Sequence, residues 1–204
     1  MDQWDKARQA YRQKAQQALH NLQVRLGEEA KRRLAQHYAV LVICASTEEV
    51  QAWQEVLNRV FKPKKQPYST AFVRWEKLPI PDPRSPSGLT EQEIALMFWN
   101  GSGSMTESFV YAHELAHIVD HGPQDERLSK DPDWIQAWQL EKGRFDLLLA
   151  DTKTLAETQK EPKEGFAIAL AAAWSNPENA KNLFPKMYHF LSQKGLVSPP
   201  PSFS

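Results

Sequence analysis

Hydrophobic and polar residues follow two rhythms along the chain, one typical of helices and one typical of strands. Residues 2–36 place apolar side chains every three or four positions and contain no proline, which predicts one or two long helices. The β-branched run Tyr38–Ala45 predicts a buried strand. The runs Tyr68–Trp75 and Ile94–Trp99 predict two further strands.

The segments between and after these strands have helical or irregular patterns. A capping sequence that begins at Ser46 predicts a helix to about Phe61. Loops are expected at 62–67, where the chain is basic, at the proline-rich 78–88, and at 100–103. After about Thr106 the expected helices are 106–121, 131–148, 163–174 and 178–193. This order of elements predicts an α+β fold with a small mixed sheet and a helical C-terminal half.

Composition limits the class of protein and its partners. The 204 residues suffice for one domain with a real core, and 41% hydrophobic with 25% charged residues is ordinary for a soluble globular protein. A formal net charge of zero gives no support for a nucleic-acid partner, and no apolar run approaches the roughly 20 residues that span a bilayer. Without a visible leader a cytoplasmic location is favoured, although a secreted chain that has lost its leader has the same composition.

Cysteine and tryptophan are expected to be structural. The single cysteine, Cys44, excludes an internal disulfide and a thiolate zinc site, and its apolar strand predicts an inert buried thiol. Several tryptophans stand at helical or strand spacing, which predicts that they pack in the core rather than form a substrate platform. They are Trp75, Trp99, Trp134, Trp138 and Trp174.

One motif predicts metal chemistry. The segment HELAH, from His113 to His117, stands in a helical pattern, so both imidazoles project from one face a turn apart and can bind one Zn²⁺. Glu114 is one residue further on, where its carboxylate reaches a water beside the metal rather than the metal itself. The motif therefore predicts one zinc ion, two histidine ligands and Glu114 as general base. The alternative is two helical histidines with a surface glutamate.

A catalytic zinc also needs a third protein ligand. His121 stands closer to the motif than the third histidine of a metzincin, so we expect a glutamate from a later helix. Glu164 opens the apolar segment Gly165–Trp174 and is the acid best placed to be held against a core. The residues leave three other acids open: Glu141, Glu157 and Glu161.

Four sequence blocks resemble a known protease family. They are HELAHIVDH, SKDPDWIQAW, EGFAIA and NPENAKNLFPKMYHFL, in that order. Over residues 105–195 they resemble the catalytic domain of anthrax lethal factor and of the Pro-Pro endopeptidases. The resemblance implies a zincin-like fold and a gluzincin-type zinc metalloendopeptidase. It assigns His113, His117 and Glu164 as ligands, Glu114 as general base, and Asp120 to orienting a ligand or the helix end.

The resemblance also implies regions and a substrate. We expect an N-terminal helical region at 1–36, a zincin-like catalytic domain at 37–195 and a loose proline-rich tail at 196–204. The implied substrate is a peptide or protein in extended conformation, which zincins align along an edge strand, expected here at Ile94–Trp99. The composition predicts no nucleic-acid or membrane partner. Nothing in the residues indicates an oligomeric state.

Two positions depart from the family pattern. Glu157 stands where the family has a tyrosine that stabilises the oxyanion, and Ile168 replaces a second glutamate. Removing an oxyanion donor costs roughly 3–4 kcal/mol, so we expect weak catalysis, a substitute donor or a local shift of the alignment. The substitute candidates are Tyr111, His121, Tyr188 and His189.

Three alternatives to an efficient endopeptidase remain. The first is a catalytically weak or inactive zinc-containing domain that binds or regulates a partner. The second is an ImmA/IrrE-type regulatory protease, whose third acid comes sooner than the 47 positions from His117 to Glu164. The third, a WLM-type repair protease, is suggested by His121-Gly122-Pro123 and disfavoured by the neutral charge.

Overall fold

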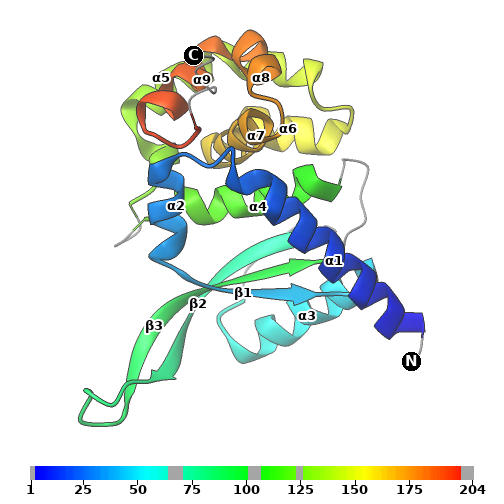
Figure 1. Cartoon of the computed structure of the whole chain (residues 1–204), viewed down its shortest axis with the longest axis vertical. Helices are drawn as coiled ribbons and strands as arrows, with labels where there is room; N and C mark the ends of the chain where they lie inside the picture. The colour runs from blue at the N-terminus through cyan, green and yellow to red at the C-terminus, as the bar shows by residue number, and fades with distance from the viewer. Residues whose placement is uncertain (1–2, 64–70, 101–106, 123–125, 199–204) are drawn as a thin grey trace. The chain divides into compact units, whose positions relative to one another are not determined.

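The computed structural model describes residues 3–63, 71–100, 107–122 and 126–198. These residues form an α+β protein, mainly helical, with a three-stranded mixed sheet (Figure 1). The α+β expectation is confirmed. The chain divides into two compact units. The first comprises Met1–Lys14 and Ala35–Ser102, and the second comprises Ala15–Leu34 and Gly103–Ser204.

The sheet of the first unit has the strand order β1-β3-β2. β1 (Tyr38–Ile43) pairs in parallel with β3 (Leu89–Trp99), and β2 (Ala71–Pro81) pairs with β3 in antiparallel fashion. Because β3 is hydrogen-bonded on both sides, the expectation that Ile94–Trp99 is an edge strand is wrong. Every residue of that stretch is buried, as expected for the centre of a sheet.

β1 forms one edge of the sheet instead. Tyr38 is 58% exposed and Val40 47%, so the prediction of a buried strand is wrong for most of its length. β-branched residues favour a strand at the edge as much as at the centre, which is why their presence did not reveal the exposure. Cys44, just beyond β1, is fully buried, and burial raises the pKa of its thiol to about 12, as expected for an inert cysteine.

Helix α3 (Thr47–Val60) packs on the sheet and completes a core. Its N-terminus is capped as predicted: Ser46 Oγ accepts from Glu49 N–H at 3.2 Å. Val50 and Leu57 of α3 join a buried cluster with strand residues such as Phe98. The expected helix is therefore confirmed, with an end at Val60.

β2 and β3 form one long hairpin. β2 continues to Pro81 and β3 begins at Leu89, so the prediction of an irregular loop over 78–88 is wrong for its first residues. The prolines misled the prediction, but an edge strand tolerates proline because one side of its backbone has no partner. The loop is restricted to 82–88, where Gly88 adopts φ 71°, a conformation that glycine accepts without strain.

The second unit is helical among its described residues. α1 (Gln3–Gln23) begins in the first unit and ends in the second, and α2 (Glu28–Ala35) follows it, so the expectation of one or two N-terminal helices is confirmed. The later elements are α4 (Glu107–Asp120), η2 (Leu128–Lys130), α5 (Pro132–Glu141), η3 (Lys142–Leu147), α6 (Thr152–Lys160), α7 (Pro162–Ser175), α8 (Pro177–Leu183) and α9 (Pro185–Gln193). α6 was not predicted, and the helix expected at 178–193 is two helices, with Pro185 starting the second.

α7 is the central helix of the second unit. Every residue from Gly165 to Trp174 is buried, and α7 contacts α4, α5, α6, α8 and α9 (Figure 1). Trp134 and Trp138 of α5 are buried as predicted, and so are Trp99 and Trp174, whereas Trp75 is only half-buried.

Three segments for which the sequence makes a prediction lie mostly outside the described residues. They are the basic loop at 62–67, the turn at 100–103 and 199–204 of the tail. The three regions expected at 1–36, 37–195 and 196–204 stay predictions. Among the described helices, none has the length and apolar character needed to cross a bilayer.

Candidate metal centre

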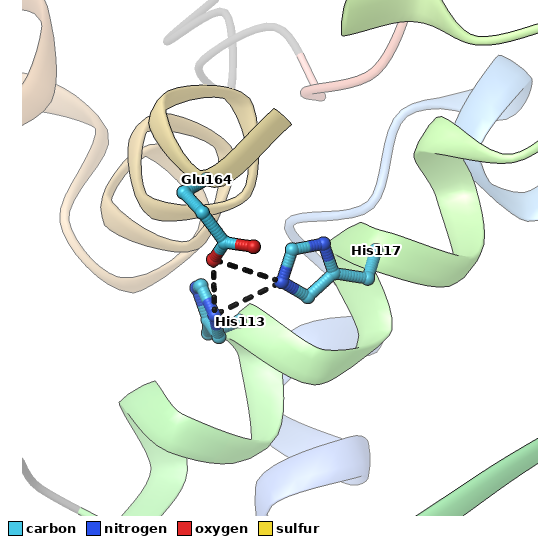
Figure 2. Close-up of side chains that lie close together, drawn as sticks. All are labelled: His113, His117 and Glu164. Carbon is cyan, nitrogen blue, oxygen red and sulfur yellow. Dashed lines mark hydrogen bonds and ion pairs between the residues drawn. The ribbon is translucent and has the colours of Figure 1, made fainter. Parts of the chain in front are cut away.

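The two histidines of the motif project from the same side of α4. Their Nε2 atoms are 3.1 Å apart, and their rings meet edge to face with centroids 4.6 Å apart (Figure 2). α4 presents this side because its other side is apolar and buried, as Ala112, Ala116 and Val119 show. Spacing by four residues within one helix therefore produces the pair that the sequence predicted.

Glu164 completes the cluster from the first turn of α7. Its Oε2 lies 3.4 Å from His117 Nε2 and 3.6 Å from His113 Nε2 (Figure 2). Among the described residues, His113, His117 and Glu164 are the group of side chains placed to hold a metal ion. Glu164 reaches the histidines because α4 and α7 pack directly against each other.

The spacing of the three donor atoms suits a small ion. Donors of a tetrahedral zinc site, each about 2.0–2.1 Å from the ion, lie roughly 3.3 Å from one another. The three separations here, 3.1, 3.4 and 3.6 Å, bracket that value. The residues therefore fit a metal ion, and the fit itself does not identify which metal.

Charge is shared unequally within the cluster. Burial alone would raise the pKa of Glu164, but the charge and hydrogen bond of His117, with His113 and Lys163, lower it to about 2. Burial opposes a charge on His117 too, yet Glu164 raises its pKa above the ordinary value. Burial and the neighbouring His117 lower the pKa of His113 to about 3. A positive charge within the cluster is thus favoured on His117, beside Glu164, and disfavoured on His113.

Glu114 lies beside the cluster without belonging to it. Its carboxyl is buried, and burial raises its pKa to about 7; Glu164 adds to this rise and His117 opposes it. A carboxyl with a pKa near neutrality can both accept and return a proton under physiological conditions. This property suits the role of general base predicted for Glu114.

The remaining candidate acids are not brought to the histidines. Glu141, the last residue of α5, is buried against the start of α9, where its carboxylate accepts from Lys186 N–H and Met187 N–H. Glu161 precedes α7 and pairs with Lys163, and Glu157 lies on α6. Of the four acids left open by the sequence, the structure places Glu164 in the cluster.

The predicted supporting residues have other positions. Asp120 is fully buried and accepts from Ser129 N–H at 2.6 Å and Ser129 Oγ–H at 2.8 Å, so it fixes the end of α4. His121 forms a β-bridge with Arg127. Tyr111 precedes His113 by two residues, and at about 100° per residue this places it on nearly the opposite side of α4.

The two remaining donor candidates lie on α9. Tyr188 is half-buried, and His189 lines a groove between α5 and α9. No contact found among the described residues joins either side chain to the three donors.

The sequence did not reveal what supports Glu164. Trp134 Nε1–H donates to Pro162 O and Trp138 Nε1–H to Thr158 O, both at 3.1 Å, so α5 holds the chain just before and at the start of α7. Gly165 lies against Trp138 so closely that a Cβ atom would come within 2.5 Å of the indole. A glycine inside an otherwise apolar helical run was the available signal.

One polar atom of the centre has no hydrogen-bond partner in the part of the chain that the structure describes. It is His113 Nδ1, which is buried. Metal-binding histidines usually donate this second N–H to a carbonyl, a carboxylate or a water.

Comparison with known proteins adds no relative. No protein-family model matches the chain, and no curated protein and no solved structure matches it significantly. The resemblance to the lethal factor family therefore rests on the four sequence blocks alone.

Proposed function

We propose that this protein is a zinc-dependent metalloendopeptidase of the gluzincin type. The observation that carries the proposal is the convergence of His113, His117 and Glu164 from two packed helices, with the buried carboxyl of Glu114 beside them. Two imidazoles and one carboxylate form the donor set typical of a catalytic zinc that keeps a position open. The order of the four family-like sequence blocks supports the same assignment.

The zinc ion and the protein side chains have separate roles in the proposed reaction. A zinc ion held by these three residues would lower the pKa of a water molecule to about 7 and polarise a carbonyl. Glu114 accepts a proton as the water attacks the scissile carbonyl, and returns it to the leaving amine. His113, His117 and Glu164 hold the site, and packing around Glu114 keeps its pKa in the useful range.

The proposed substrate is a peptide or protein segment in extended conformation. The family resemblance makes proline-containing peptides a sensible first library, and the cytoplasmic location remains a prediction. Among the candidate oxyanion donors, Tyr111 lies on the far side of α4, and Tyr188 and His189 lie on α9. We therefore expect slow turnover compared with a zinc protease that has a dedicated tyrosine.

The decisive experiment combines metal analysis with peptide cleavage. Protein purified without chelator is expected to contain one zinc per chain, and to cleave members of a peptide library with products identified by mass spectrometry. Glu114→Gln is expected to keep the zinc and lose cleavage by at least 100-fold, because it removes the base but no ligand. His117→Ala is expected to lose both. Absence of stoichiometric zinc in the wild-type chain would disprove the proposal.

A second candidate is a zinc-containing domain that binds a partner without cleaving it. The position of Tyr111 on the far side of α4 favours this candidate, because a hydroxyl there supplies no oxyanion donor to the cluster. Stoichiometric zinc combined with no chelator-sensitive product across the library would select the binding domain over the enzyme.

A further inference from the structure

Arg33 of α2 contacts the C-terminal end of the helix that carries both histidines. Its Nε–H donates to Val119 O at 2.5 Å, and its Nη2–H donates to Asp120 O at 3.1 Å. The side chain is 8% exposed, so the guanidinium makes these contacts while buried. Arg33 is separated from its two acceptors by 86 and 87 positions in sequence.

These contacts satisfy groups that a helix leaves open. The last carbonyls of a helix have no partner within it, and they carry the negative end of the helix dipole. A buried guanidinium supplies both hydrogen-bond donors and a compensating positive charge. His117 stands only two residues before Val119, and its own carbonyl accepts from His121 N–H at 3.3 Å. Fixing the last turn of α4 therefore fixes the direction in which His117 projects.

A glycine allows the guanidinium to approach so closely. A Cβ atom on Gly122 would lie 2.7 Å from Arg33 Nη2 and 2.5 Å from Glu126 O. Gly122 N–H donates to Glu126 O at 2.6 Å, and Arg33 Nη2–H lies 3.3 Å from the same carbonyl. Arg33 thus holds the end of α4 and the chain that returns beside it.

α2 is itself anchored at its other end. Gly27 N–H donates to Leu196 O and Glu29 N–H to Gly195 O, both at 3.1 Å. Leu26 also forms a β-bridge with Val197. Because these hydrogen bonds fix the start of α2, they also limit the movement of Arg33 near its end.

We propose that Arg33 is a positioning residue of the metal centre: it clamps the last turn of α4 and so sets the geometry of His117 relative to His113 and Glu164. The proposal rests on the function proposed above, since it assumes that this cluster binds metal. Substituting groups that orient metal ligands typically weakens metal binding by about 10–100-fold.

The test compares four full-length proteins: wild type, Arg33→Lys, Arg33→Met and Arg32→Met. Arg32 is the matched control, because it is the neighbouring arginine, is 54% exposed and pairs with Glu29 at the surface. Zinc affinity is measured by competition with a chromophoric chelator, and ligand geometry by the absorption spectrum of the cobalt-loaded protein. Circular dichroism at the same temperature establishes that each variant is folded.

We expect about 10–100-fold weaker zinc binding and an altered cobalt spectrum in Arg33→Met, a smaller change in Arg33→Lys, and no change in Arg32→Met. Wild-type affinity and spectrum in both Arg33 variants would overturn the proposal. If Arg33→Met does not fold, Arg33→Lys decides by the same two measurements.

A second measurement separates this proposal from the proposed function. In zinc-free protein, amide hydrogen exchange is expected to quicken in peptides covering 117–122 of the Arg33 variants, but not in peptides from α7. Equally faster exchange throughout the second unit would indicate a merely structural role and overturn the proposal. If wild-type protein binds no zinc, the proposed function fails, but the hydrogen-exchange result still tests the role of Arg33. Faster exchange confined to 117–122 in the Arg33 variants would then support the clamp, and unchanged exchange there would overturn it.

Discussion

At the scale of single residues, the absence of a side chain matters as much as the presence of a ligand. Gly165 directly follows Glu164, and its missing Cβ lets α7 approach the indole of Trp138. Glycine within a helix costs about 1 kcal/mol relative to alanine, so this position gives up helix stability for close packing. The register of Glu164 against α4 depends on that approach.

Gly165→Ala is therefore expected to damage both the fold and the centre. The added methyl overlaps Trp138 and should lower the free energy of unfolding by about 1–3 kcal/mol and weaken zinc binding at least tenfold. Denaturant unfolding and chelator competition measure the two effects.

The matched control is Gly143→Ala, since a Cβ there meets nothing within 4 Å. It should leave zinc affinity unchanged and keep or slightly raise stability. Equal zinc affinity in Gly165→Ala and wild type would show that close packing at this position does not set the ligand geometry.

Sequence reasoning identified donors better than it identified their surroundings. His113 and His117 are four residues apart in one helix, so their proximity is a local property that the chain reveals directly. Glu164 could only be ranked above Glu141, Glu157 and Glu161, because the choice depends on which acid the packing of α7 brings to α4.

At the scale of elements, the sequence predicts helix α4 but not the interactions that end it. The helix itself was predicted from periodicity, but the interactions that terminate it come from α2 and η2. Asp120 accepts two hydrogen bonds from Ser129, and the guanidinium of Arg127 lies 3.9 Å from its carboxylate. The end of the helix is thus fixed by buried polar contacts rather than by a glycine cap.

Asp120→Ala is expected to destabilise the second unit by about 1–3 kcal/mol, because it leaves the buried Ser129 N–H without its acceptor. Thermal or denaturant unfolding followed by tryptophan fluorescence measures the change. Asp146→Ala, at an exposed position of η3, should fall within about 0.5 kcal/mol of wild type. Equal stability of the two variants would contradict the role given to Asp120.

Strand prediction failed for an identifiable reason. The prolines at 79 and 81 argued against a strand, yet β2 is an edge strand, where a missing N–H breaks no ladder bond. Strand order was equally hidden, since the run Ile94–Trp99 is apolar whether it lies at an edge or at the centre. Both errors concern neighbours in space, which hydrophobic period does not encode.

At the scale of the whole molecule, the proposed metal belongs to one unit. All three donors lie in the second unit, on α4 and α7. Zinc at 100 times its dissociation constant should stabilise that unit by about 2.7 kcal/mol, and a chelator should reverse the effect. Hydrogen exchange should slow in α4 and α7 while the amides of β3 stay unchanged.

His117→Ala provides the control for this prediction, because it removes a ligand and should abolish the zinc-dependent protection. Equal protection by zinc in His117→Ala and in wild type would show that the ion binds elsewhere. Protection that spreads equally over β1, β2 and β3 would show that the two units respond as one.

The second unit also assembles from distant parts of the chain. Ser198 Oγ–H donates to Leu26 O across 172 positions, and the contacts of Gly27 and Glu29 with 195–196 close the same loop. Closing so long a loop loses conformational entropy before the stabilising contacts form, and this slows folding. At roughly 5–20 residues per second of translation, α2 waits on the order of 10–30 seconds for these partners to be synthesised. We therefore expect the helix that presents the histidines to gain its Arg33 support only after residues 195–198 have been made, so newly made chains should reach their tightest zinc binding only after that point.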